Sequence, residues 1–397
     1  MTLDMLRRRK KLLASAAAVV AIVALVSSPV LLSASVRSYL YREMSFQLLA
    51  DRIVGDDNAS PEEITIRIAE YVEEGLYPGG GPVLDTNAWN DLVRGIAWCD
   101  QHVWLMSTLL AKKNIPGRMV YLLDEGRHVI GEVLVEDEWR AIDPLYGFVF
   151  RRAEDHALPT VANLSEDPAI VFDNERMQAL PVEARRKVAE FFSLMFPVAT
   201  EPSRWSSLLE IRNASLPRRI VDRTIRLMLS TFGEWPAYRF QDLYLGLLPD
   251  RLVALDSSQP DSNMPVFHDK SEDPALFLYY KARNYHLYER GVRAEQLYEE
   301  LLTRYPDSPY GEKGEFFLGS LSLQVHHDPA AAVDRLSRFL ERNPDTGWSA
   351  PTHYLMGRAY EELGNVAMAE RHYRLASSDP FVGAASRLSQ LALQPGS

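Results

Sequence analysis

The sequence has little cysteine: Cys99 is the single one among 397 residues. A lone cysteine excludes an internal disulfide, so the fold must form without that covalent link. Cys99 is therefore either a buried, inert side chain or a working thiol. Burial is the usual state of a free cysteine, so the residues around Cys99 must decide between the two.

Long basic segments are also missing after residue 11, and the chain carries a formal net charge of −11. Because an acidic surface repels nucleic acid, we predict no nucleic-acid binding. His326 and His327 have no cysteine or carboxylate at metal-ligand spacing, so we expect a solvated loop there and predict neither a metal nor a cofactor. A hydrophobic content of 47% beside 24% charged residues argues against global disorder.

One long run of uncharged residues extends from Leu12 to Ala34 and follows a basic cluster that ends at Lys11. About 20 apolar residues in a helix cross a bilayer core, and basic residues stay on the cytoplasmic side. We therefore predict a cytoplasmic basic tail (1–11), a single-pass transmembrane anchor in the inner, cytoplasmic membrane (12–34), and the bulk of the chain on the periplasmic, extracytoplasmic side. A cleaved signal peptide ending near Ser35 is the alternative. A buried helix of a soluble protein is a third interpretation.

The rest of the chain changes its hydrophobic period along its length. Ser60, Pro61 and Glu63 have the spacing of a capping box with proline in the first turn, which predicts the start of a helix. Residues 98–113 have the pattern of a buried helix, and three strand-like segments follow, at 118–123, 129–135 and 139–142. This order predicts an α+β domain in which a helix packs on an antiparallel sheet. We divide the exported part into that domain (35–155), a helical region of unknown role (156–255), a polar linker (256–274) and helical repeats (275–397).

The repeats are indicated by prolines that recur at nearly equal spacing, at positions 306, 344 and 380. In the units that these prolines close, residues suit the small and aromatic positions at which paired helices pack: Gly357, Tyr360, Gly364, Ala369 and Tyr373 in the third unit, and Ala282, Tyr285, Ala294 and Tyr298 in the first. The second unit offers Gly319, Ala332 and Leu336 and departs elsewhere. This segment resembles tetratricopeptide repeats. The resemblance implies α-helical hairpins whose concave surface binds a protein partner; packing against the preceding domain is the alternative.

Four linked segments surround the lone cysteine in the chain: Gly95 to Cys99 before the predicted helix, Asn114 to Val120 after it, His128 to Val133 on one strand, and Trp139 to Pro144 on the next. Their order resembles the transglutaminase-like, papain-related superfamily. There a cysteine begins a helix, an Ile-Pro-x-Arg segment leads to the sheet, a strand reads His-Ala-Trp-x-Glu-Val, and an Asp-Pro follows a tryptophan. The resemblance covers about residues 84–150 and implies a Cys99, His128 and Asp143 catalytic triad. The chain departs from the pattern at Val129-Ile130 and at the residues that flank Cys99, Trp98 and Asp100.

The chemistry of a thiol enzyme needs these residue types. A thiolate is the attacking species, and a helix N-terminus and a neighbouring histidine both favour it. His128 would take and return the proton, provided that Asp143 fixes its ring. His102 is the rival base, because it lies on the same helical face as Cys99, but no orienting acid is evident for it. An oxyanion hole would use the Cys99 N–H and a second donor, with Trp89, Asn90 and Trp98 as candidates.

We therefore expect a membrane-anchored, exported enzyme that forms an acyl-enzyme at Cys99. Family resemblance implies an amidase, protease or acyl transferase acting on a peptide or protein. A second hypothesis is a non-catalytic envelope scaffold that binds partners through its repeats and its papain-like domain. A third is a transmembrane assembly factor in which the stem and the middle region matter most.

Overall fold

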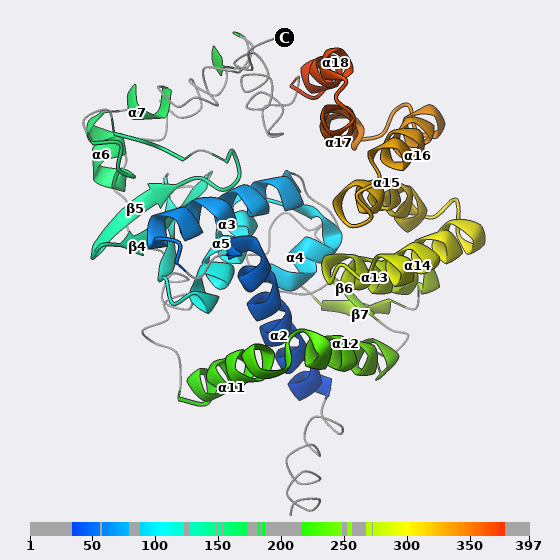
Figure 1. Ribbon diagram of the computed structural model, residues 1–397, viewed down its shortest axis with the longest axis horizontal. Helices are drawn as coiled ribbons and strands as arrows, with labels where there is room; N and C mark the ends of the chain where they lie inside the picture. Colours follow the sequence, from blue (N-terminus) through cyan, green and yellow to red (C-terminus); the bar gives the residue numbers. More distant parts are fainter. Residues whose placement is uncertain are drawn as a thin grey trace, which may run out of the picture. The chain divides into compact units, whose positions relative to one another are not determined.

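The computed structural model describes residues 34–55, 58–78, 88–122, 128–147, 149–152, 155–167, 169–172, 182, 185–186, 216–247, 252–255, 267–271 and 273–377. The predicted basic tail and the predicted anchor up to residue 33 lie outside these ranges. Within them, no helix is both long and apolar enough to cross a membrane. The described chain is mostly helical, with a small three-stranded antiparallel sheet and a C-terminal run of packed helix pairs (Figure 1).

The chain forms two compact units. The first joins the chain up to Leu48 with Asp222–Leu248, and the second joins Leu49–Val221 with Pro249–Ser397. The first unit contains most of helix α2 (Ala34–Val54), most of α11 (Leu216–Phe232) and α12 (Trp235–Leu247). Its core includes the stacked rings of Tyr41 and Tyr244, whose centroids are 4.1 Å apart.

In the second unit, helix α3 (Pro61–Gly75) begins with the predicted capping box: the Glu63 N–H donates to Ser60 Oγ, and the Ser60 N–H donates to a Glu63 carboxylate oxygen. Helix α5 (Cys99–Lys112) contacts the strands β3 (Gly117–Tyr121) and β4 (Val129–Val135). Strand β5 (Glu138–Ile142) completes the antiparallel sheet in the order β3-β4-β5. The predicted helix and the three predicted strands are confirmed.

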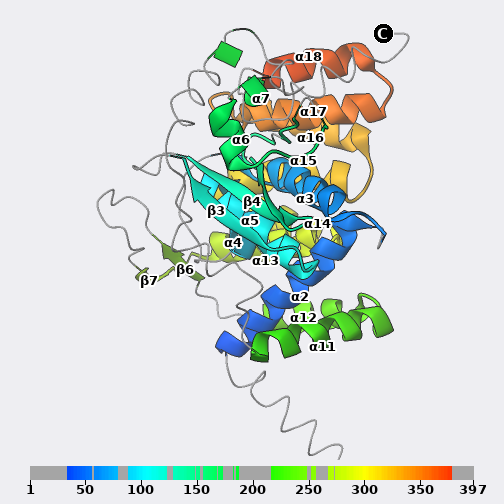
Figure 2. The same ribbon diagram turned by 90° about the vertical axis from the view of Figure 1, so that its left-hand side faces the viewer.

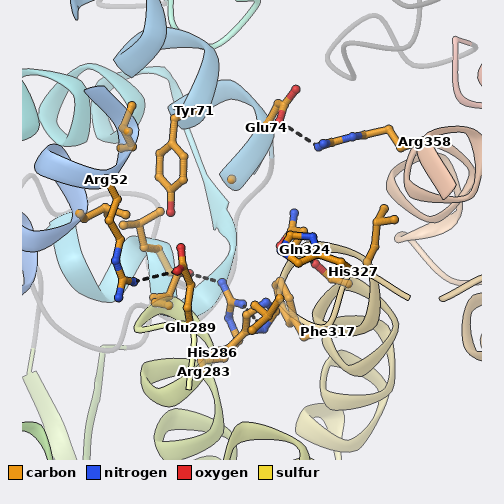
Figure 3. A pocket seen from close by; sticks show the side chains of 18 of the residues that line it. Arg52, Tyr71, Glu74, Arg283, His286, Glu289, Phe317, Gln324, His327 and Arg358 are labelled. Atoms are coloured by element: carbon orange, nitrogen blue, oxygen red, sulfur yellow. Dashed lines mark hydrogen bonds and ion pairs between the residues drawn. The ribbon is translucent and has the colours of Figure 1, made fainter. Parts of the chain in front are cut away.

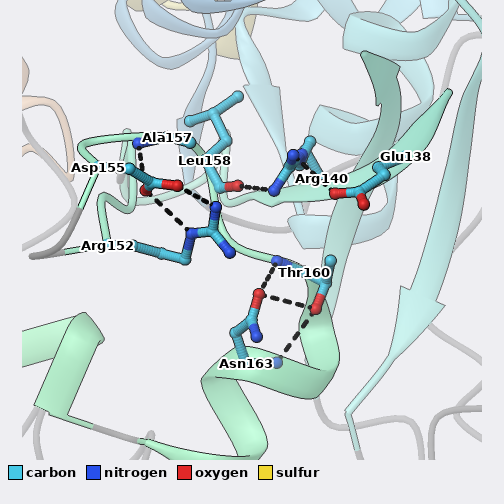
Figure 4. A network of polar contacts seen from close by, with 8 residues as sticks. All are labelled: Glu138, Arg140, Arg152, Asp155, Ala157, Leu158, Thr160 and Asn163. Atoms are coloured by element: carbon cyan, nitrogen blue, oxygen red, sulfur yellow. Dashed lines mark hydrogen bonds and ion pairs between the residues drawn. The ribbon is translucent and has the colours of Figure 1, made fainter. Parts of the chain in front are cut away.

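The free edge of β5 is held by the chain that leaves the sheet (Figure 4). The Ala141 N–H donates to the Pro159 carbonyl at 2.7 Å, and Arg140 Nη1 donates to the Leu158 carbonyl at 2.8 Å. Thr160 then caps α6 (Val161–Glu166) by accepting from the Asn163 N–H. A short helix, α7 (Ala169–Phe172), follows. Pairing at this edge leaves fewer open backbone groups for a foreign strand.

Three helix pairs make up the end of the described chain: α13 (Pro274–Leu287) with α14 (Gly291–Arg304), α15 (Pro309–Gln324) with α16 (Pro329–Arg342), and α17 (Ser349–Glu362) with α18 (Val366–Ala376). Figure 2 shows them stacked one after another. Pro306 and Pro344 follow the ends of α14 and α16 as the spacing predicts, while Pro380 lies outside the described residues. The strands β6 (Leu252–Leu255) and β7 (Phe267–Ser271) pair antiparallel, so part of the predicted linker 256–274 is a strand.

The first helices of the pairs contact the segment that leads to Cys99. This segment contains the short strand β1 (Tyr77–Pro78), helix α4 (Ala88–Arg94) and the strand β2 (Ile96–Ala97), which pairs parallel with β1. Helix α13 packs on α4, and the ring of Tyr77 makes edge contacts with Phe316 and Trp348. The helix pairs and the sheet-bearing part therefore belong to one compact unit and contact each other directly.

Candidate active site

Cys99 occupies the first position of α5 and is partly buried. Its side chain packs against the buried cluster of Val103, Met119 and Val129. Amides in the first turn of a helix have no intrahelical acceptor, and the helix dipole places partial positive charge there. The one thiol of the chain thus lies where a negative charge on sulfur is stabilised.

His128 and Asp143 lie at the ends of β4 and β5 nearest Cys99. The register of the hairpin, in which Gly131 pairs with Ile142, brings them together. His128 Nε2 donates to Asp143 Oδ2 at 2.7 Å, and their side chains are 1% and 0% exposed. Because Nε2 is committed to the carboxylate, Nδ1 is the ring nitrogen left for the Cys99 side chain, which is near enough to influence the pKa of His128. The structure thus brings together the three residues of the predicted triad.

The carboxylate of Asp143 is itself fixed from both sides. Its second oxygen, Oδ1, accepts the backbone N–H groups of Leu145 at 3.0 Å and Tyr146 at 3.3 Å. The Tyr146 ring also packs edge-on against the His128 imidazole, with centroids 5.5 Å apart. Sequence reasoning missed Tyr146, although an aspartate whose side chain accepts from the following backbone is a common turn signal.

Burial alone would lower the pKa of His128. The charge and hydrogen bond of Asp143, with a hydrogen bond and charge from Cys99, outweigh burial and raise the pKa to about 9. The imidazolium form is therefore held at neutral pH between a carboxylate and a sulfur. An imidazolium in this position carries a proton that it can donate.

His102, the rival base, is fully buried and engaged elsewhere. Its Nδ1 lies 2.8 Å from the Trp98 carbonyl oxygen, and its Nε2 lies 3.2 Å from the Leu76 carbonyl oxygen. Burial lowers the pKa of His102, although both backbone contacts oppose this. With both ring nitrogens facing carbonyl oxygens, this residue has a structural role in fixing the start of α5.

A polar network that sequence reasoning missed holds the start of α5 to α4. The Trp98 N–H donates to Gln101 Oε1 at 3.0 Å, and Gln101 Nε2 donates to Asp91 Oδ1 at 2.8 Å. Arg94 pairs with the same Asp91 oxygen at 2.9 Å. Asp91 is 1% exposed. Oδ1 of this buried carboxylate thus links α4 to the first turn of α5, so the orientation of the Cys99 helix depends on α4.

Helix α13 of the repeats in turn binds the end of α4. Tyr279 Oη donates to the Val93 carbonyl at 2.9 Å and lies 3.1 Å from that of Arg94. Arg283 Nη2 donates to the Leu92 carbonyl at 2.8 Å, and its Nε donates to the Val93 carbonyl at 3.2 Å. The last carbonyls of a helix have no intrahelical donor, so the repeats supply the C-terminal cap of α4.

The three candidates for a second oxyanion donor have different settings. The indole N–H of Trp89 is buried and donates to Asn284 Oδ1 at 2.9 Å, and Asn90 is buried with its Oδ1 accepting from Tyr280 Oη at 3.1 Å. Both face the repeats. The backbone N–H of Trp98 is taken by Gln101. Trp98, which directly precedes Cys99 in the chain, is by contrast 55% exposed.

Two cavities lie outside the triad. One of about 390 Å³ is bounded by α3, α13 and α15 (Figure 3), and its charges pair with one another: Arg52 lies 3.4 Å from Glu289, and Arg358 lies 3.0 Å from Glu74. Another, of about 400 Å³, lies on the sheet beside Arg118 and Trp139. Among the described residues, no group of three or more histidine, cysteine, aspartate or glutamate side chains is placed to hold a metal ion.

Comparison of the chain with protein-family models, with curated proteins and with solved structures finds no significant match.

Proposed function

We propose that the chain is a thiol enzyme of transglutaminase-like type that forms an acyl-enzyme at Cys99 from a peptide or protein amide. The observation that carries the proposal is the buried His128–Asp143 pair next to the single thiol at a helix N-terminus. We also propose two finer assignments of the fold. Helix α5 packs on the three-stranded sheet in a papain-like arrangement, and the helix pairs pack like tetratricopeptide repeats. We also propose the predicted anchor and an extracytoplasmic location for the enzyme.

In the proposed mechanism, Cys99 Sγ attacks the carbonyl carbon of the amide, and the carbonyl oxygen takes up the negative charge. The Cys99 N–H, free of an intrahelical acceptor, is placed to stabilise that oxyanion. The carbon–nitrogen bond then breaks, and the His128 imidazolium gives its proton to the departing amine. The product is a thioester on Cys99 and a free amine.

The thioester is resolved by water or by a second amine. His128, now neutral, accepts a proton from the attacking molecule, and the thiolate leaves as the new acyl bond forms. Asp143 stabilises each imidazolium stage and holds the ring so that Nδ1 stays toward sulfur. Hydrolysis and acyl transfer share every step except the identity of this acceptor.

Trp98 indicates which substrates the site favours. A tryptophan ring that is 55% exposed beside the nucleophile offers a flat apolar surface. Apolar or aromatic groups next to the scissile amide would cover it and gain burial energy. We propose that Trp98 contacts the acyl side chain of the substrate.

The experiment uses the fact that Cys99 is the only cysteine, so every thiol label reports on it. Full-length protein is treated with iodoacetamide over a range of pH, and alkylation is measured by intact mass. We expect alkylation at pH 6 to be about tenfold slower in His128→Ala, because the neighbouring cation that favours the thiolate is lost. Equal rates in both proteins at pH 6 would refute the ion pair and favour a non-catalytic domain.

Catalysis itself is tested by trapping. Membrane-envelope extracts are incubated with the full-length protein, which is then quenched in acid and searched for a thioester at Cys99. His128→Ala and Asp143→Asn serve as variants that slow the resolving step. If no acyl adduct forms in any of the three proteins, the scaffold hypothesis replaces the enzyme.

A further inference from the structure

Helices α11 and α12, which belong mostly to the first compact unit, expose an unusual amount of apolar surface. Of the exposed large apolar side chains among the described residues, the majority belong to α11 and α12: Ile220 (56% exposed), Leu227 (66%), Phe232 (67%), Trp235 (63%), Leu243 (37%) and Leu247 (45%). Single exposed apolar residues are normal on a protein surface, but a cluster on two adjacent helices marks an interaction site.

These side chains are separate from those that hold the unit together. Ile225, Leu229, Ala237 and Leu245 are buried and form the packed sides of the two helices. On α12, Trp235, Arg239 and Leu243 follow at intervals of one helical turn, so they lie on one face. The guanidinium of Arg239 lies 5.6 Å from the centre of the Trp235 ring. Each of the two helices thus carries exposed apolar side chains in addition to its packed ones.

The charge of this pair of helices differs from that of the whole chain. Arg219, Arg223 and Arg239 are exposed on it, and together the two helices hold more arginines than carboxylates. The whole chain has a formal net charge of −11. Exposed arginines mixed with tryptophan, phenylalanine and leucine are typical of helices that lie at the surface of an anionic bilayer.

The same unit contains the part of the chain that would emerge from a membrane. Helix α2 begins at Ala34, the last residue of the uncharged run over 12–34. If that run is an anchor, this unit is the first folded structure outside the bilayer. The partner that best fits both the arginines and the apolar side chains is therefore the bilayer surface.

We propose that the pair of helices α11 and α12 docks on anionic phospholipid, with Leu227, Trp235 and Leu243 entering the headgroup region and Arg223 and Arg239 pairing with phosphate groups. Docking would restrain the exported part of the chain beside the membrane. The inference is independent of the chemistry proposed at Cys99.

The test places one fluorophore at a chosen site of the full-length chain. In a Cys99→Ser background, Leu243→Cys is labelled with an environment-sensitive dye, and Glu341→Cys on α16, also exposed, is the matched control. Each protein is reconstituted into phosphatidylcholine vesicles with and without phosphatidylglycerol, which contain lipid carrying a nitroxide quencher. We expect quenching at 243 but not at 341, and more of it with the anionic lipid.

The arginines are tested with Arg223→Gln and Arg239→Gln in the same labelled background. Each neutralisation should lower the docked-to-undocked ratio by roughly fivefold. Equal quenching at 243 and 341, or none at either site, would overturn the proposal. Energy transfer between dyes on different copies of the chain, if it persists without the quencher lipid, would assign the exposed side chains to contact with a second copy. That result would also overturn the proposal. Circular dichroism of each variant checks that the helices remain folded.

Discussion

A substitution at Gly95 tests whether the repeats hold the segment that leads to Cys99. Gly95 follows α4 and has a φ of +71°. A Cβ atom at this position would collide with the Phe317 ring of α15: it would lie 3.2 Å from Cε2, 3.3 Å from Cε1 and closer still to Cζ. The ring has little room to move, because Arg283 lies 3.7 Å from its centre on one side and Trp348 contacts it as well. Gly95→Ala therefore combines an unfavourable backbone conformation with an overfilled contact.

The chain offers a matched control for the backbone part of this cost. Gly364 has the same φ of +71°, but a Cβ there meets nothing within 4 Å. A left-handed alanine costs about 1 to 2 kcal/mol, and overpacking adds about 1 to 3 kcal/mol. We expect Gly364→Ala to lower the free energy of unfolding by about 1 kcal/mol and Gly95→Ala by about 3 kcal/mol.

Urea unfolding followed by circular dichroism gives both values, and iodoacetamide alkylation of Cys99 gives the local effect. Gly95→Ala should slow alkylation at pH 6, whereas Gly364→Ala should leave it unchanged. Adding Phe317→Leu to Gly95→Ala should recover about 1 to 2 kcal/mol, as contacting residues do in a double-mutant cycle. If Gly95→Ala costs no more than Gly364→Ala, the contact between the repeats and the Cys99 segment is refuted.

Three further predictions concern the site. Because Asp143 and Cys99 raise the pKa of His128 from 6.5 to about 9 against the effect of burial, its protonation stabilises the fold fully below pH 6.5, and this is lost as the pH rises to about 9. In Asp143→Asn, burial dominates and lowers the pKa of His128. The free energies of unfolding of the wild-type protein and of Asp143→Asn should therefore differ more at pH 6 than at pH 9.5, and a difference that does not depend on pH would contradict this. Trp98→Ala should lower kcat/KM about tenfold for substrates with an aromatic acyl side chain, because roughly 1.4 kcal/mol of contact is lost. Trp98→Phe should retain most of the wild-type kcat/KM. Equal kinetics in the wild-type protein and both variants would place the substrate elsewhere. Arg283→Met removes the donors to the end of α4 and should lower the free energy of unfolding by about 3 kcal/mol, whereas Arg293→Met on the exposed side of α14 should change it little, as thermal unfolding would show.

The sequence by itself determined the local elements and the chemistry. Ser60 and Glu63 specify where α3 begins because a capping box is satisfied within four residues. The change of period after Pro116 specifies a helix followed by an antiparallel sheet, since alternation and helical spacing are local properties. The lone Cys99, the strand position of His128 and the Asp-Pro at 143 then indicated a thiol site, because only a few arrangements of these residue types perform that chemistry.

Tertiary structure decided what lies around that site. His102 and His128 are both near Cys99 in sequence or register, and only the fold shows that one faces backbone carbonyls while the other faces a carboxylate. The caps that Tyr279 and Arg283 place on α4 join residues 185 to 191 positions apart in the sequence, so no local pattern reveals them. The same holds for the exposed face of α11 and α12, because helical spacing shows that a helix has an apolar side but not which of its sides the rest of the molecule covers.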